Sequence, residues 1–145
     1  MKDLSQLIID KKSVWMEYPG MPGFEVEITN LARKELERLR KRCITTKFDR
    51  GSRLPIEDLD GDKFATEFSK AVVKDWKGLT LDYLQSLILI KTKGLDLTEE
   101  LEYTQDNAEM LVTGSVEFNG WLNEVAFDLD NFREEAESGD NGGAE

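Results

Sequence analysis

The sequence predicts an α+β fold that is predominantly α: a short N-terminal β-hairpin, a compact bundle of about five helices, and a disordered acidic tail. Three observations predict this class. Strand-forming residues alternate with Glu before residue 30, apolar residues recur at helical spacing after it, and residues 134–145 are polar and glycine-rich. Because 39% of the 145 residues are apolar, we expect a single globular domain over residues 1–133 and a flexible tail over 134–145.

The hairpin is expected over about residues 14–29. Two segments, Val14–Tyr18 and Phe24–Thr29, are rich in β-branched and aromatic residues, and the second alternates apolar residues with Glu. Residues 19–23 lie between them and contain two Pro-Gly dipeptides, which favour turns. The pattern therefore predicts two paired strands joined by a loop of about five residues.

Helices are expected at about residues 30–43, 61–77, 80–91, 104–113 and 115–133, because apolar side chains recur at helical spacing in these segments. The residues placed to begin them are Asn30, Asp60 or Asp62, Thr80, Thr104 or Gln105, and Ser115. Residues 45–60 lack a helical period and contain Gly51 and Pro55. This segment is therefore expected to be an extended connection or a loop.

Charge is distributed unevenly along the chain, whose formal net charge is −11. Residues 31–53 contain nine basic and three acidic residues, whereas residues 95–145 contain one basic and fifteen acidic residues. The acidic half repels phosphates and anionic lipid, so neither nucleic acid nor membrane is expected as a partner. The basic segment is open to two interpretations: a solvated helix face, paired or not with the acidic half, or a partner-binding surface.

The composition argues against enzyme chemistry and bound metal. The chain has no histidine, and its one cysteine, Cys43, is expected to pack in the core of a protein from a reducing compartment. Counted from Asp58, the sixth and twelfth positions of an EF-hand loop hold Lys63 and Ser69 instead of Gly and Glu. With no phosphate-binding loop or cysteine cluster either, we expect a protein that is not an enzyme and has no cofactor.

Three stretches, residues 71–79 (AVVKDWKGL), 106–111 (DNAEML) and 117–132 (EFNGWLNEVAFDLDNF), together resemble the tail assembly chaperones of long-tailed bacteriophages. The resemblance covers roughly residues 12–133 and is strongest over 64–132. It implies a protein that keeps the tape measure protein soluble and helps recruit tail tube protein. It also implies a location in the host cell cytoplasm and absence from the mature virion.

Candidate partner-binding residues come from two segments. Arg38, Lys41 and Arg42 lie on the basic face of the helix expected over 30–43, where they are placed to steer a charged partner. Leu87 and Ile90 belong to an apolar run, residues 87–90, that is more hydrophobic than a one-sided surface helix requires. Self-association is left open. The alternative function is an acidic phage-encoded protein that inhibits a host basic or DNA-binding protein.

Overall fold

The computed structural model describes residues 2–9 and 11–133, so the tail predicted for residues 134–145 lies outside the described residues. Within them the chain forms five α-helices and five strands in two sheets, with 43% of residues helical and 21% in strands. The predicted class, a short hairpin followed by a helical bundle, is therefore wrong. The fold is mixed α/β, because two segments expected to be helix and loop form strands.

The larger sheet has three antiparallel strands in the order β1–β2–β5: β1 (Ser13–Glu17), β2 (Glu25–Thr29) and β5 (Val73–Lys77). The strands predicted before residue 30 do pair, yet β5 extends them into a sheet. The helix expected over 61–77 ends at Val72, and the chain continues directly as β5. The reason is tertiary: β2 offers β5 a hydrogen-bonding edge, and Trp76 buries its side chain from the strand.

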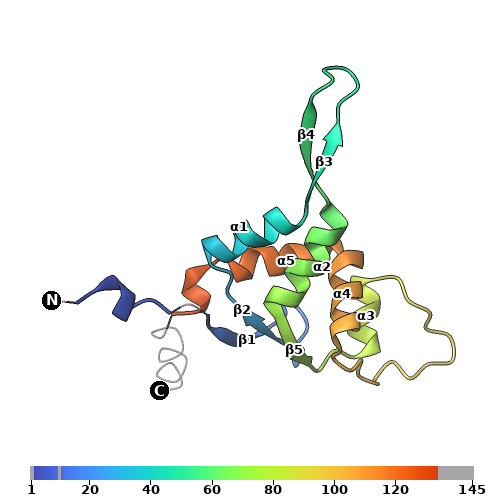
Figure 1. Ribbon diagram of the computed structural model, residues 1–145. Helices are drawn as coiled ribbons and strands as arrows, with labels where there is room; N and C mark the ends of the chain where they lie inside the picture. Colours follow the sequence, from blue (N-terminus) through green and yellow to red (C-terminus); the bar gives the residue numbers. More distant parts are fainter. Residues whose placement is uncertain (1, 10, 134–145) are drawn as a thin grey trace.

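The second sheet is a hairpin of β3 (Ile44–Phe48) and β4 (Pro55–Leu59), in the segment expected to be an extended connection or a loop. Its residues are almost all exposed, and Figure 1 shows it projecting away from the rest of the molecule. The backbone N–H of Asp60 donates to the carbonyl of Cys43 over 2.8 Å and closes its base. We call residues 44–59 the arm.

The helices are α1 (Arg33–Arg42), α2 (Gly61–Val72), α3 (Leu81–Leu87), α4 (Gln105–Gly114) and α5 (Val116–Ala126). Four N-caps are confirmed, because the side-chain oxygens of Asp60, Thr80, Thr104 and Ser115 accept the expected backbone N–H groups at 3.0–3.2 Å. The cap expected at Asn30 is wrong. Its side-chain oxygen accepts the N–H of Lys12 instead, and α1 begins after Ala32.

The core lies between the larger sheet and the helices. Aromatic rings from the sheet side and from α5 meet at its centre: the centroid of Tyr18 lies 5.6 Å from Phe24, 5.9 Å from Phe118 and 4.8 Å from Trp121. Because α2 and α4 also pack together, this core supports the body of the molecule without any contribution from the arm tip. None of the helices in the described part of the chain has the length and apolar character to span a membrane.

Candidate partner-binding surfaces

The arm exposes large apolar side chains. Phe48 is 67% exposed and Leu54 is 62% exposed. Cross-strand register pairs Phe48 with Pro55 and Lys47 with Ile56, so apolar residues lie on both faces of the hairpin near its tip. An isolated two-stranded hairpin is marginally stable in water. Because these apolar side chains are exposed, they contribute little free energy of burial to the fold. The arm therefore carries the features of a surface that a partner covers.

Local hydrogen bonds shape the tip of the arm. The carboxylate of Asp49 accepts the Ser52 hydroxyl at 2.6 Å and the backbone N–H groups of Gly51 and Ser52 at 3.2 and 3.3 Å. These bonds, that of the Ser52 hydroxyl first, hold the pKa of Asp49 below its usual range. Arg53 takes the left-handed conformation, with φ of 59°, which completes the reversal of the chain.

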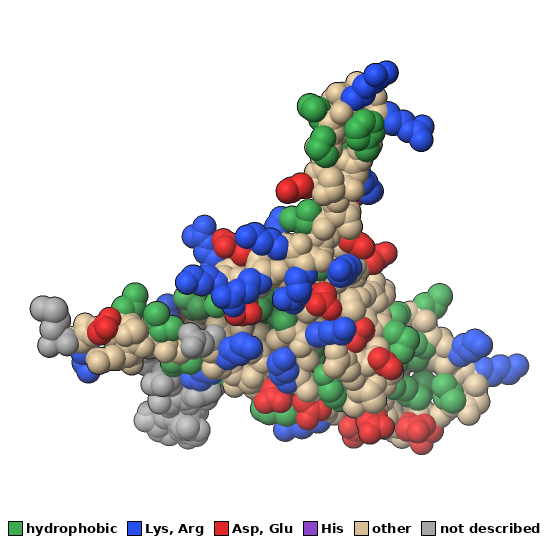
Figure 2. All heavy atoms as spheres, viewed as in Figure 1, with side chains coloured by type: hydrophobic (Ala, Val, Ile, Leu, Met, Phe, Trp, Pro, Cys, Tyr) green, Lys and Arg blue, Asp and Glu red, His purple; other side chains and the backbone are tan. Residues whose placement is uncertain are grey.

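Next to the arm, α1 presents a basic surface made by its exposed cations: Arg33, Lys34, Arg38, Arg40, Lys41 and Arg42. Figure 2 shows Lys and Arg side chains gathered over α1 and at the arm tip, and Asp and Glu side chains along the side farthest from the arm. Of the sequence-predicted residues, Arg38 pairs with Glu35 on the same helix at 2.7 Å, and Lys41 is exposed. The structure thus brings the three predicted cations together on one helix.

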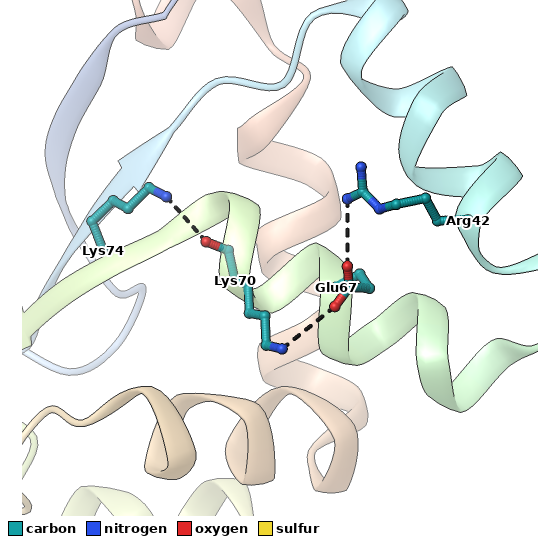
Figure 3. Close-up of polar contacts among 4 residues, drawn as sticks. All are labelled: Arg42, Glu67, Lys70 and Lys74. Carbon is teal, nitrogen blue, oxygen red and sulfur yellow. Dashed lines mark hydrogen bonds and ion pairs between the residues drawn. The ribbon is translucent and has the colours of Figure 1, made fainter.

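The third predicted cation, Arg42, links α1 to α2. Its guanidinium lies 3.4 Å from the carboxylate of Glu67, which also lies 3.5 Å from the Lys70 ammonium (Figure 3). The ammonium of Lys74, at the start of β5, donates to the backbone carbonyl of Lys70 near the end of α2 at 3.0 Å. Arg42 therefore links two helices, whereas the partner of Arg38, Glu35, lies on the same exposed helix, so Arg38 and Lys41 are the better placed candidates for an external partner.

The structure separates the two predicted apolar candidates. Leu87 is 7% exposed and belongs to the core, and Ile90 is half-buried and packs against the core. Leu89 is 98% exposed, because α3 ends at Leu87 and the following residues are extended. The sequence analysis did not select Leu89, because it expected the helix to continue to residue 91. Leu89 is the residue of this run that is available to a partner.

The outer face of the larger sheet is acidic around one aromatic residue. Trp15 is 41% exposed, and cross-strand register sets Glu27 opposite Trp15 and Asp75 opposite Glu27. The Lys77 ammonium lies 4.8 Å above the Trp15 ring and 3.8 Å from the carboxylate of Glu25. An exposed Trp ringed by carboxylates is a good receptor for a cationic side chain.

The aspartates considered for calcium have other partners. Asp58 lies 2.7 Å from the ammonium of Lys47, and Asp60 accepts the Lys63 N–H as the α2 cap. They border a hollow of about 330 Å³ at the base of the arm. Across the residues that the structure describes, no three His, Cys, Asp or Glu side chains are grouped so as to hold a metal ion. Asp58 thus serves as an ion-pair partner within the arm and Asp60 as a helix cap.

Cys43 is fully buried where α1 meets the arm, and burial raises the pKa of its thiol. An unfolded cysteine has a pKa of about 8.5. The buried neutral thiol therefore supports folding fully below that pH, and the support is lost as the pH rises above it. We expect the free energy of unfolding to fall between pH 8 and 10 more steeply in the native chain than in Cys43→Ala, measured by urea titration. Equal slopes would contradict this.

Comparison with known proteins gives one finding about ancestry. The model of a family described as YdaY prophage protein matches residues 27–142. The match begins within β2 and covers the arm, β5 and the helices α1–α5. No match was found among curated proteins or among solved structures.

Proposed function

The chain belongs to the YdaY prophage protein family and is phage-derived, and we propose that it is a tail assembly chaperone. In this role it binds the tape measure protein, keeps it soluble and helps recruit tail tube protein around it. It acts in the host cell cytoplasm and is left out of the mature virion. It needs no catalytic chemistry, because holding a client requires surface contacts alone.

The observation that carries the proposal is the arm with its unburied apolar side chains. A chaperone for a long, aggregation-prone client must offer apolar surface while staying soluble itself. The arm places Phe48, Leu54 and Ile56 at a distance from the core, so binding there requires no opening of the fold. Leu89 adds a second exposed apolar contact on a different part of the molecule.

Charge supports the same role. Residues 95–133 contain ten acidic residues and one basic residue, which favours solubility of a complex whose apolar surface is partly exposed. The alternative function, an acidic inhibitor of a basic host protein, is less well supported. The basic surface of α1 would repel such a target.

Co-expression with the tape measure protein of the same phage tests the proposal. We expect the native chain to keep the client in the soluble fraction and to be recovered with it in a pull-down. Replacing Phe48→Ser and Leu54→Ser together should weaken binding by at least about 100-fold, because each buried apolar side chain contributes about 1.5–3 kcal/mol.

Val116→Ser is the matched control, since Val116 is 89% exposed but lies at the start of α5, away from the arm. It should leave binding unchanged. Tail tube protein serves as a second bait. If a folded and soluble sample bound neither protein, the chaperone proposal would be wrong.

A further inference from the structure

We infer that the basic surface of α1 binds the outer face of the β1–β2–β5 sheet in a second copy of this chain. The inference does not depend on the chaperone proposal, because it concerns the chain alone. On α1, Lys34, Arg38 and Lys41 recur at i, i+4 and i+7, so they form one ridge. The buried residue of this helix, Leu39, lies on the side facing the core.

The receiving surface is the solvent side of the sheet. Val26 and Ile28 of β2 are fully buried, so the alternating residues Glu25 and Glu27 point to the opposite side. Trp15 and Asp75 of the neighbouring strands lie on this same side by register. The surface therefore combines carboxylates with an exposed aromatic ring, and an incoming cation has to displace the Lys77 ammonium, which lies 4.8 Å above that ring and 3.8 Å from Glu25.

The spacing of the two surfaces agrees. Cations four residues apart on a helix are separated by about 6 Å along its axis, and those three apart by about 4.5 Å. Carboxylates two residues apart on a strand, such as Glu25 and Glu27, are separated by about 6.8 Å, and neighbouring strands by about 4.8 Å. A helix laid on this face brings each cation near a carboxylate, and an Arg side chain near the Trp15 ring.

Charge also favours a second copy of the chain over a nucleic acid as the partner of the basic surface. A nucleic acid would meet the basic surface only against the repulsion of a chain with a net charge of −11. A second copy carries the complementary surface itself, on the side of the sheet opposite the buried Val26 and Ile28. At physiological salt the repulsion between distant acidic residues is screened beyond about 8 Å, whereas contacting pairs keep their attraction.

Analytical ultracentrifugation of the purified full chain tests this contact. We expect the mass to rise above the 16.6 kDa of one chain with concentration at about 0.15 M salt, where the long-range repulsion is screened, and to return toward it in 0.5 M salt. The variants Arg38→Glu/Lys41→Glu and Glu25→Lys/Glu27→Lys should each weaken self-association by 10-fold or more. An equal mixture of the two variants should restore association, because the native helix of one variant meets the native sheet of the other, and the reversed helix meets the reversed sheet.

Two control variants carry the same changes in net charge elsewhere. Lys91→Glu/Lys93→Glu and Glu99→Lys/Glu102→Lys alter exposed residues outside both surfaces and should leave association as in the native chain. Quenching of the exposed Trp15 fluorescence should decrease as the copies associate. A mass of one chain at every concentration, or failure of the mixture to associate, would overturn the inference. A Glu99/Glu102 variant that abolished association would also overturn it, by moving the acidic partner surface to the loop before α4.

Discussion

Gly78→Ala should destabilise the protein by about 2–5 kcal/mol. Gly78 has a φ of +76°, a conformation that costs an L-residue about 1–2 kcal/mol. A Cβ atom at this position would lie 1.9 Å from the backbone oxygen of Gly23, and backbone cannot rotate away as a side chain can. Relieving the overlap must separate β5 from the turn between β1 and β2, at an overpacking cost of about 1–3 kcal/mol. The melting temperature, measured by thermal unfolding, should fall by on the order of 10 °C.

Gly20→Ala is the matched control for this prediction. Gly20 has nearly the same conformation, with φ of +80°, but no atom lies within 4 Å of the position that its Cβ would take. This variant should lose only the conformational share, about 1–2 kcal/mol. The difference between the two melting temperatures isolates the close approach of Gly78 to Gly23. Equal melting temperatures would show that this contact does not constrain the fold.

Local signals in the sequence predicted the parts of the fold that depend on neighbouring residues. The caps at Thr80, Thr104 and Ser115 were found because each side-chain oxygen bonds an N–H three residues ahead. Asn30 does not cap α1, because its side-chain oxygen accepts the backbone N–H of Lys12, which lies 18 residues away in the chain. Long-range partners of this kind leave no periodic trace.

The strand β5 shows how periodicity misleads. Phe68, Val72 and Trp76 recur every four residues and are all buried, which favours a helix through residue 77. The chain changes to a strand at Val73, yet Trp76 still reaches the core and its indole N–H donates to the Leu101 carbonyl at 2.9 Å. Burial alone therefore does not distinguish a helix from a strand at residues 73–77. The strand forms because its backbone pairs with the edge of β2.

The arm was missed for a different reason. A strand is usually recognised by apolar residues alternating with polar ones, and that pattern arises when one face is buried. Neither face of the arm is buried, so residues 44–59 show no such alternation. The remaining signals were the β-branched and aromatic residues of β3 and the turn residues that follow it, Asp49, Gly51 and Ser52. The basic residues of α1, in contrast, lie together on one helix as their run in the sequence predicts, because charge runs are visible without tertiary contacts, and their role in partner binding stays a prediction.

Shortening the arm should abolish client binding and leave the fold intact. Thr45 and Asp58 face each other in the hairpin register, so replacing residues 46–57 with Asn-Gly joins them by a two-residue turn. The removed residues are exposed, apart from the half-buried Asp49, and lie outside the core. The melting temperature should change by no more than a few degrees, because surface changes usually cost under about 0.5 kcal/mol and the Lys47–Asp58 ion pair is also exposed.

Leu122→Ala provides the opposite test, because Leu122 is a fully buried residue of α5. This variant should lose about 2–5 kcal/mol of stability, yet below its melting temperature it should still bind the tape measure protein through an unchanged arm. The two variants together separate folding from client binding, with thermal unfolding as one measurement and the pull-down as the other. Full client binding by the shortened chain would move the client surface away from the arm, and Leu89 would then be the exposed apolar residue to test next.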